Sequence, residues 1–214
     1  MATDPLSRPV SALRTVLLTV ALLLTGAAAL ARATDGFHAD TTETARRVAV
    51  RRHPVPVPMV PLENQAGVPL TLADFHGQWV LVDFIYTRCL TLCMTLGSDF
   101  AQLGRQLAAP IAEGKVALLS ISFDPTHDGP AELAAYLARF RDRDSAWQAA
   151  RPVTAEGLGR LTHALGLTVI PDSMGGFTHN AAILLVDPAG DLVDILDIGQ
   201  VEQVKAAVLR RLAS

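Results

Sequence analysis

The chain has 214 residues, of which 50% are hydrophobic and 18% are charged, and its formal net charge is −3. This composition supports one substantial core and excludes intrinsic disorder for most of the chain. Two cysteines are too few for a disulfide-dense scaffold. The basic residues are scattered rather than gathered into one patch, which argues against nucleic acid as a partner.

The N-terminus has the layout of an export signal. Arg8 and Arg14 precede the apolar run Val16–Leu24, and a stretch of small residues, Ala27–Ala33, follows it. The stretch ends with Ala31-Arg32-Ala33, in which two small residues are separated by one other residue. This pattern predicts cleavage after Ala33. An uncleaved anchor is the alternative, although the apolar run is shorter than the roughly 20 residues that a spanning helix needs. We therefore assign residues 1–33 to a signal peptide or N-terminal membrane anchor.

Residues 34–61 predict an extended spacer between that segment and the folded domain. The stretch is first polar, then basic, then rich in proline, which is typical of a solvated tether. A basic patch at a membrane surface is the alternative interpretation. The basic residues are Arg46, Arg47, Arg51 and Arg52, and the prolines are Pro54, Pro56, Pro58 and Pro61.

The remaining residues, 62–214, form the predicted folded domain, which opens with a βαβ unit. Trp79–Tyr86 is a β-branched and aromatic run with the length of a strand buried on both faces. A helix is predicted from Thr91 to about Glu113, and Val116–Phe123 is a second apolar strand. The unit predicts parallel strands joined by a right-handed crossover. The apolar positions of the helix include Leu92, Leu96, Leu103 and Leu107.

The C-terminal half predicts helices followed by a hairpin and a last helix. Pro130 suits the first turn of one helix, and a second runs from Thr154 to near Gly166. Ala181–Asp187 and Leu192–Ile198 have the signature of a β-hairpin, and Gln200–Leu212 closes the chain as a helix. This order predicts an α/β, thioredoxin-like, peroxiredoxin-related three-layer fold with a helical insertion and a C-terminal β-hairpin plus helix.

Both cysteines lie at the junction between the first predicted strand and its helix, in the segment Cys89-Leu-Thr-Leu-Cys93. Chemistry in open α/β sheets is often placed outside the carboxyl ends of the strands. A helix N-terminus also lowers the pKa of a thiol. A structural disulfide across so short a loop gives only about 2 kcal/mol, which makes a staple a poor explanation. Two inert buried thiols are the remaining alternative.

The spacing of the cysteines favours a metal over a permanent disulfide. Residues four apart on a helix have Cβ atoms about 5–6 Å apart, whereas a relaxed disulfide needs about 3.8 Å. Two sulfurs on one metal lie about 4 Å apart, which is easier to reach. A reducible disulfide stays available if Cys89 lies in the loop or in a distorted first turn.

A third ligand must come from elsewhere, and His179 is the strongest candidate. It lies in a glycine-containing loop that leads directly into the strand Ala181–Val186. Two thiolates and an imidazole suit copper or zinc. The other histidines are predicted to be surface or core residues: His38, His53, His76, His127 and His163.

These motifs resemble the Sco (SenC-type) family of copper chaperones for cytochrome c oxidase assembly. The resemblance covers about Leu62 to Leu212. Three segments carry it: Val82-Asp-Phe-Ile-Tyr-Thr-Arg-Cys89-x3-Cys93, the motif Asp124-Pro-x-x-Asp128-x-Pro130, and the His179 loop with the strand after it. Their order along the chain matches the family.

The resemblance implies a membrane-tethered or exported periplasmic protein that binds one copper ion, Cu(I) or Cu(II), per monomer through Cys89, Cys93 and His179. Such a protein passes copper, or electrons, to the binuclear copper centre of cytochrome c oxidase, and its cysteines cycle between dithiol and disulfide. It is a metallochaperone rather than an enzyme. The motif Asp124–Pro130 is then a structural loop that also faces the partner.

This chain departs from the family pattern beside the ligands. Leu90-Thr-Leu92 and Met94 stand where the family usually has an Asp-rich segment and a proline, and Thr178 stands where it commonly has Asp. Loss of such an outer carboxylate typically costs about 10–100-fold in metal affinity. We expect Met94 to pack in the core rather than to bind the metal.

The alternative function is an extracytoplasmic thiol–disulfide oxidoreductase with copper incidental. Cys89 would attack the target and Cys93 would resolve the mixed disulfide. The spacing is one residue longer than in C-x-x-C, which argues against it. A peroxidase of the peroxiredoxin type and a family member without metal are the remaining interpretations.

Overall fold

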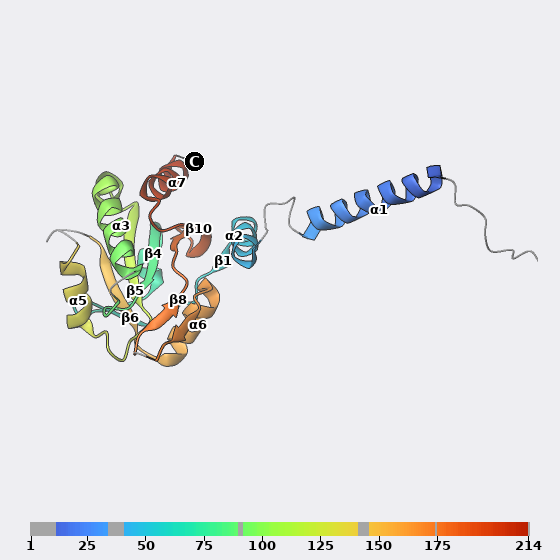
Figure 1. The fold of residues 1–214 in the computed structure, drawn as a ribbon. Coiled ribbons are helices and arrows are strands. Elements are labelled where there is room, and N and C mark those ends of the chain that lie inside the picture. Colours follow the sequence, from blue (N-terminus) through green and yellow to red (C-terminus); the bar gives the residue numbers. More distant parts are fainter. Residues whose placement is uncertain (1–11, 34–40, 90–91, 141–145, 174, 214) are drawn as a thin grey trace, which may run out of the picture. The chain divides into compact units, whose positions relative to one another are not determined.

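A computed structural model of the protein describes residues 12–33, 41–89, 92–140, 146–173 and 175–213. The chain divides into two compact units, Met1–Ala49 and Val50–Ser214. Helix α1 (Ala12–Ala33) belongs to the first unit, and α2 (Thr42–Arg52) runs across the boundary. The second unit holds all the strands and the other helices (Figure 1).

Helix α1 coincides with the predicted signal or anchor. Its segment Ala12–Arg32 has a mean hydropathy of 2.0 and is long and apolar enough to cross a membrane. At 1.5 Å per residue the 22-residue helix is about 33 Å long, which matches a hydrocarbon core of about 30 Å. Signal sequences share this length and composition, so both interpretations of residues 1–33 stay open.

The segment predicted as an extended spacer contains a helix, so the prediction of an extended chain is wrong for residues 42–52. α2 occupies Thr42–Arg52, with Glu43 in its first turn and Arg51 and Arg52 in its last. A negative charge near the N-terminus of a helix and positive charges near its C-terminus stabilise it, because they interact favourably with the helix dipole. Strand β1 (Val55–Pro56) then pairs with the main sheet. Residues 34–40 lie outside the described part of the chain.

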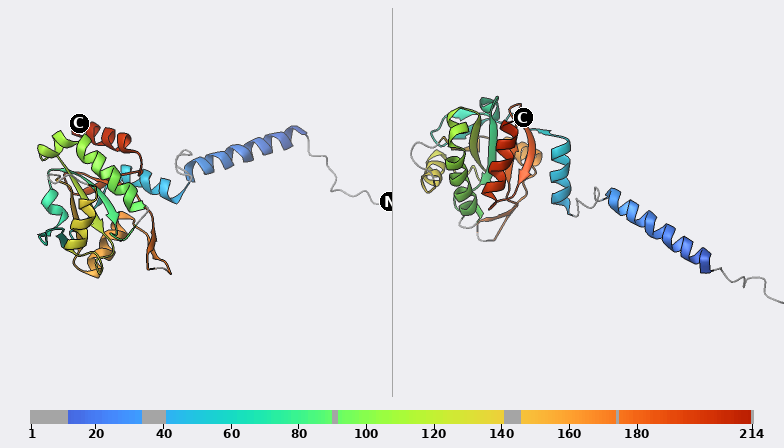
Figure 2. Two further views of the ribbon diagram at one scale, coloured as in Figure 1. Left: turned by 60° about the vertical axis from the view of Figure 1, so that its left-hand side comes forward. Right: turned by 90° about the horizontal axis from the view of Figure 1, so that it is seen from above.

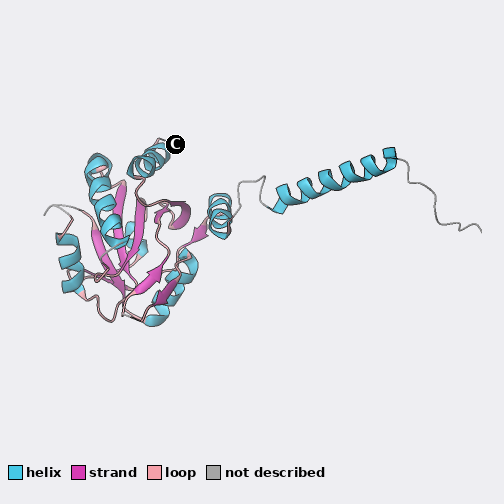
Figure 3. Ribbon diagram, in the orientation of Figure 1, coloured by secondary structure: helices cyan, strands magenta, loops and turns pink. Residues whose placement is uncertain are grey.

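The core of the second unit is an eight-stranded mixed sheet (Figure 3). Besides β1, its strands are β2 (Leu62–Asn64), β3 (Pro69–Leu70), β4 (Trp79–Ile85), β5 (Val116–Ser122), β6 (Gln148–Pro152), β9 (Ile183–Val186) and β10 (Asp191–Leu196). Their order is β1-β10-β9-β4-β5-β6-β2-β3. β4, β5 and β6 are parallel, and the other neighbours are antiparallel. The two central strands, β4 and β5, are buried almost throughout, as their continuous apolar sequences predict.

Helices cover the sheet. They are the 3-10 helix η1 (Leu72–Phe75), α3 (Leu92–Gln106), α4 (Ala108–Ala112), α5 (Pro130–Ala138), α6 (Ala155–Leu165) and α7 (Val201–Leu212). α3 and α7 pack against each other (Figure 2). α6 contacts β1 and β6 and lies away from α3 and α7 (Figure 1). The layered α/β architecture is therefore the predicted one, including the β9–β10 hairpin and the last helix.

Other local features also differ from the prediction. The helix expected from Thr91 to Glu113 is divided into α3 and α4 at Leu107. Pro110 has no main-chain N–H to continue the α3 ladder, which explains the division. Strand β6 was not predicted, because its sequence Gln-Ala-Ala-Arg-Pro has no β-branched or aromatic residue.

Candidate metal centre

The two cysteines lie beyond the carboxyl end of β4, as predicted. Cys89 follows the strand by a turn in which its N–H donates to the Tyr86 carbonyl over 3.1 Å. Cys93 lies in the first turn of α3, and its N–H donates to the Cys89 sulfur over 3.4 Å. Cys89 is therefore in the loop before the helix, the position that lets the two sulfurs approach.

The predicted third ligand, His179, comes from a separate two-stranded sheet. β7 (Val169–Pro171) pairs antiparallel with β8 (Phe177–His179), and His179 is opposite Val169. The expectation that His179 lies in a loop is therefore wrong, because this residue ends a paired strand. The pairing with β7 fixes the main chain at the histidine.

The structure brings Cys89, Cys93 and His179 together. Their two sulfurs and a ring nitrogen of His179 all lie within 4.8 Å of one another. The relative exposures of the three residues are 4%, 0% and 8%. The site is thus a compact, buried set of two sulfur donors and one nitrogen donor. Metal ligation by these residues stays a prediction.

The hydrogen bonding of His179 leaves one ring nitrogen available for a ligand. Nδ1 lies 3.0 Å from the Asn180 carbonyl, which only accepts, so Nδ1 carries the hydrogen in this bond. Nε2 is buried and has no hydrogen-bond partner among the described residues. A buried polar atom without a partner is costly unless something else binds it. The donor set and this bare nitrogen fit a soft or borderline metal ion.

Burial also sets the ionisation of the site. Burial raises the pKa of Cys93 far above its ordinary value, and the nearby Cys89 and Asp83 raise it further. The expected lowering of a thiol pKa by the helix N-terminus is therefore wrong for Cys93, because desolvation outweighs it. Burial lowers the pKa of His179, against its hydrogen bond to Asn180, and so keeps the imidazole neutral. Neutral imidazole is the form that binds metals.

Aromatic rings enclose the histidine. The His179 ring is 4.9 Å from the Phe123 ring and 6.1 Å from the Tyr86 ring. Tyr86 in turn meets Phe177 edge-on at 5.2 Å. No sequence pattern pointed to this enclosure, because its members follow β4, follow β5 and lie on β8.

The loop after β5 supports the loop that carries Cys89. Arg88 forms an ion pair with Asp124 over 2.8 Å, and His127 Nδ1 lies 2.8 Å from the same carboxylate. Burial alone would raise the pKa of Asp124, but hydrogen bonds from His127 and Arg88 lower it below its ordinary value. The Asp124–Pro130 motif therefore has the structural part of the role that we predict for it.

Several other candidates lie away from the cluster. Met94 is 39% exposed, so the expectation that it packs in the core is wrong. It follows Cys93 on the outer side of the first turn of α3. The histidines outside the cluster are exposed at His53, His76, His127 and His163. His38, Leu90 and Thr91 lie outside the described residues.

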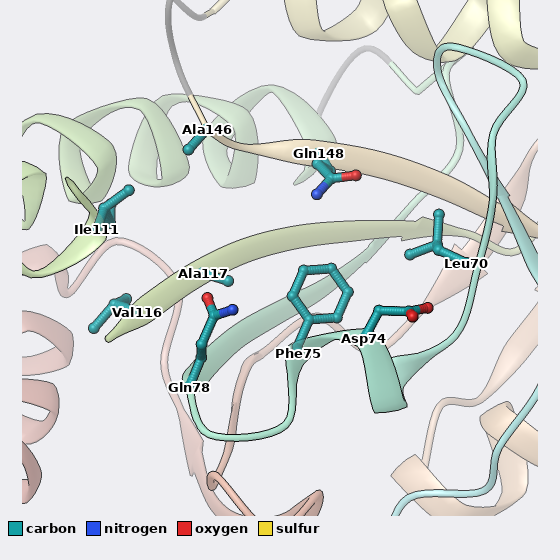
Figure 4. Close-up of a pocket in the computed structure, with 9 residues that line it drawn as sticks. All are labelled: Leu70, Asp74, Phe75, Gln78, Ile111, Val116, Ala117, Ala146 and Gln148. Atoms are coloured by element: carbon teal, nitrogen blue, oxygen red, sulfur yellow. The ribbon is translucent and has the colours of Figure 1, made fainter. Parts of the chain in front are cut away.

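A pocket of about 230 Å³ lies at the opposite end of the sheet (Figure 4). Val116 and Ala117 line it at the start of β5, and Gln148 lines it at the start of β6. The cysteines instead follow the carboxyl end of β4. Asp74, also in the lining, is held by the Thr71 N–H at 2.6 Å. This pocket is therefore separate from the Cys–His cluster.

A mixed sheet of this order, with a cysteine pair at the start of the first helix it feeds, defines a thioredoxin-like protein. The histidine beside the pair adds a metal-ligand set that a simple thiol site does not need. The chain belongs to the SCO1/SenC family, whose sequence model matches residues 61–214. The predicted family is thereby confirmed.

One individual relative has a name that refers to copper. A protein of Stutzerimonas stutzeri, provisionally named as copper-binding, is 31% identical over 140 residues, which is 64% of this chain and 66% of the relative. This chain therefore spans just under two thirds of that relative's length.

Solved structures confirm the fold. Bradyrhizobium japonicum ScoI with copper bound is 23% identical with a TM-score of 0.61, covering 72% of this chain and 98% of that one. BsSco, described as a member of the Sco family of cytochrome c oxidase assembly proteins with a disulfide switch, is 22% identical with a TM-score of 0.62. That match covers 74% of this chain and 94% of BsSco.

Proposed function

We propose that this protein binds one copper ion per monomer through Cys89, Cys93 and His179 and serves the assembly of the binuclear copper centre of cytochrome c oxidase. The observation that carries the proposal is the buried donor set within 4.8 Å, with His179 Nε2 unpartnered among the described residues. Thiolates and a neutral imidazole suit Cu(I), and they also accept Cu(II). The family and the copper-bound relative support the choice of metal.

The residues have distinct tasks in this proposal. Cys89 and Cys93 bind the ion as thiolates, because metal binding displaces the thiol protons. His179 supplies Nε2 while its Nδ1 stays tied to the Asn180 carbonyl. No acid–base catalyst is required, since copper passes between proteins by ligand exchange. The receiving partner is a copper protein that offers competing thiolates or imidazoles.

The location follows from α1. We infer that residues 1–33 export the domain to the periplasm, either as a cleaved signal or as an anchor that tethers it to the membrane. The residues between that segment and Val50 then connect it to the compact unit Val50–Ser214, which acts as a monomer. Delivery of copper and reduction of the target cysteines are two forms of the same assembly task.

Copper stoichiometry tests the proposal. The full chain is reduced, reconstituted with Cu(I), desalted and analysed for copper per protein. We expect one copper per wild-type monomer, a loss of retention in His179→Ala, and full retention in the control His163→Ala, which changes an exposed histidine on α6. Negligible copper in the wild type, or retention unaffected by His179→Ala, would overturn the proposal.

A specific observation also favours a thiol–disulfide oxidoreductase. The Cys93 N–H approaches the Cys89 sulfur within 3.4 Å, so the two cysteines are adjacent, and neither is already in a disulfide. An oxidoreductase would reduce a protein disulfide catalytically without copper. The assembly factor would reduce at most the cysteines of its own copper-receiving partner, so turnover of an unrelated disulfide substrate by the copper-free protein separates the two functions.

A further inference from the structure

The carbonyl group that accepts from His179 belongs to Asn180, and the side chain of Asn180 has no task in the proposed function. Nδ1 of His179 lies 3.0 Å from this carbonyl oxygen. Asn180 follows the last residue pair of the β7–β8 ladder, and β9 begins only at Ile183. Strand pairing therefore does not fix the direction of the carbonyl group, and the support must come from elsewhere.

The Asn180 side chain forms two hydrogen bonds with the loop between α6 and β7. Its amide oxygen accepts from the Thr168 N–H over 2.7 Å, and its amide nitrogen donates to the Gly166 carbonyl over 2.9 Å. Because a main-chain N–H only donates and a carbonyl only accepts, the two partners fix which end of the amide is the oxygen. Thr168 precedes Val169, the partner of His179 in the ladder, so the side chain extends the ladder by one step.

The two groups that hold the side chain belong to the end of a firmly anchored helix. Gly166 is the C-cap of α6, with a φ of +65° that favours glycine. The N–H groups of Gly166 and Leu167 donate to carbonyl groups in the last turn of α6, over 3.3 and 2.8 Å. Leu165, the last residue of the helix, is 1% exposed. The Asn180 amide thus connects the residue beside the histidine to a fixed point of the fold.

We propose that Asn180 is a positioning residue for His179. Its side chain holds the Asn180 carbonyl in the direction that keeps the ring hydrogen on Nδ1 and leaves Nε2 for the metal. The inference rests on the proposed function only in treating His179 as a ligand.

The chemistry of imidazole explains why such a support is needed. Only one tautomer of a neutral histidine has Nε2 free to bind, and a partner for the other nitrogen selects it. Histidine in water favours the opposite tautomer, with the hydrogen on Nε2, so the protein must supply the selection. An amide side chain suits the task, because it both donates and accepts.

The first test measures the tautomer of His179 by nuclear magnetic resonance. The full-length protein, with nitrogen-15 in its histidines, is kept reduced and metal-free at pH 8, where neutral rings dominate. Long-range correlations between ring protons and nitrogens show which nitrogen carries the hydrogen, and the signals of His179 are those lost in His179→Ala. In Asn180→Ala we expect the ratio of the Nδ1–H to the Nε2–H tautomer to fall about three- to tenfold.

The matched control is Asn64→Ala, at the other asparagine of the chain. The Asn64 side chain accepts from the N–H groups of Ala66 and Val68 over 2.9 and 3.0 Å. It lies on β2, which β4, β5 and β6 separate from β9 in the sheet. We expect this variant to lose stability while keeping the wild-type tautomer ratio to within about twofold, because distant sites act independently. Thermal unfolding of both variants checks that the fold is intact.

A second test needs no substitution. If the Asn180 amide holds the loop, the Thr168 N–H of the wild type should exchange with deuterium about fivefold or more slowly than in an unstructured chain. Exchange at the rate of an unstructured chain overturns the proposal, even where Asn180→Ala does not fold.

Copper affinity is a third readout. Outer partners of a metal-binding histidine typically contribute about 10–100-fold to affinity, and Asn180→Ala removes only the support of that partner. We therefore expect Cu(I) to bind about tenfold more weakly in Asn180→Ala, measured by competition with bathocuproine disulfonate. Asn64→Ala should keep the wild-type affinity.

The outcomes separate this inference from the proposed function. A folded Asn180→Ala with an unchanged tautomer ratio, or with a shift toward Nδ1–H, overturns the positioning role. So does an equal shift in Asn64→Ala, because general loss of stability would then explain it. Failure of the wild type to retain copper overturns the proposed function alone, because the tautomer ratio and the exchange rate are measured without metal.

Discussion

Asp128 holds Thr87 by two hydrogen bonds, one from the Thr87 main-chain N–H at 3.0 Å and one from its hydroxyl at 2.6 Å. The carboxylate also accepts from the Ser122 hydroxyl at 2.5 Å and is fully buried. Thr87 precedes Cys89 by two residues. Asp128 thus ties the loop that carries the first cysteine to the loop after β5.

Replacement of Asp128 should show how much this link matters. Asp128→Ala leaves the buried Thr87 N–H without a partner and should lower the free energy of unfolding by roughly 2–4 kcal/mol. Asp128→Asn should cost only about 1 kcal/mol, because the Thr87 hydroxyl can turn to accept from the amide. Urea denaturation of the metal-free protein measures both. Equal effects of the two variants would contradict this account.

Asp83 should make stability depend on pH. It is fully buried on β4, and neither carboxylate oxygen has a hydrogen-bond partner among the described residues. Burial raises its pKa to about 7, although Ser120, beside it on β5, opposes the shift. The folded state therefore holds this proton at a pH where the unfolded chain has released it.

The direction of the pH dependence follows from this difference in pKa between the folded and the unfolded state. The contribution of Asp83 is most favourable below the unfolded pKa near 4 and is lost as the pH rises through about 7, a change of about 4 kcal/mol. Asp83→Asn should remove this decline and be more stable than the wild type at pH 8. Urea unfolding of the reduced, metal-free protein between pH 5 and 8 measures it. Glu156→Gln, an exposed site, should keep the wild-type slope, and a wild-type slope in Asp83→Asn would refute the assignment.

Two glycines on α3 should respond oppositely to alanine. A Cβ at Gly97 would lie 2.5–2.7 Å from three ring atoms of Phe140, whereas one at Gly104 would lie 3.4 Å from a Leu118 methyl group. Gly97→Ala should therefore cost about 1–3 kcal/mol through overpacking. Gly104→Ala should be neutral or gain up to about 1 kcal/mol from helix propensity. Thermal unfolding compares them, and a stabilised Gly97→Ala would show that Phe140 moves aside freely.

Export of the domain depends on α1 in our proposal. Alkaline phosphatase, which is active only after export, would be fused after Ser214 and should be active in a Gram-negative host. Arginine at both Leu18 and Leu22 should abolish this activity, because each charge costs about 2.5–3.5 kcal/mol at the centre of a membrane helix. Leu18→Ala with Leu22→Ala is the matched control. Activity that survives the two arginines would place the export information elsewhere.

The parts of the fold that could be predicted are those with continuous local signals. β4 and β5 are unbroken apolar runs, and α6 has Thr154 as its N-cap and Gly166 as its C-cap, so their positions follow from sequence. α2 was missed because the four arginines and following prolines resemble a solvated tether. The acidic residue in the first turn of α2 and the two arginines in its last turn nevertheless favour a helix at this position.

The site also has some parts with a local sequence signal and other parts without one. The cysteine pair is a local motif, and His179 stands out through its loop and the family resemblance. The β7–β8 pairing was missed because each strand has only three residues and both contain or adjoin turn residues. Tyr86 was missed as a member of the site, because its sequence context indicates only the end of a buried strand. Its contacts with Phe177 and His179 depend on tertiary structure.

Because β7 and β8 form a separate sheet, the proposed metal site has two parts that differ in local stability. The cysteines belong to the junction of β4 and α3 in the centre of the domain, whereas His179 is held by a ladder of three residue pairs. Local opening of such a ladder requires far less free energy than global unfolding. The nitrogen donor can therefore leave while both sulfurs stay in place. A cargo ion would then be held by two ligands instead of three, and a partner's imidazole could enter the vacated position.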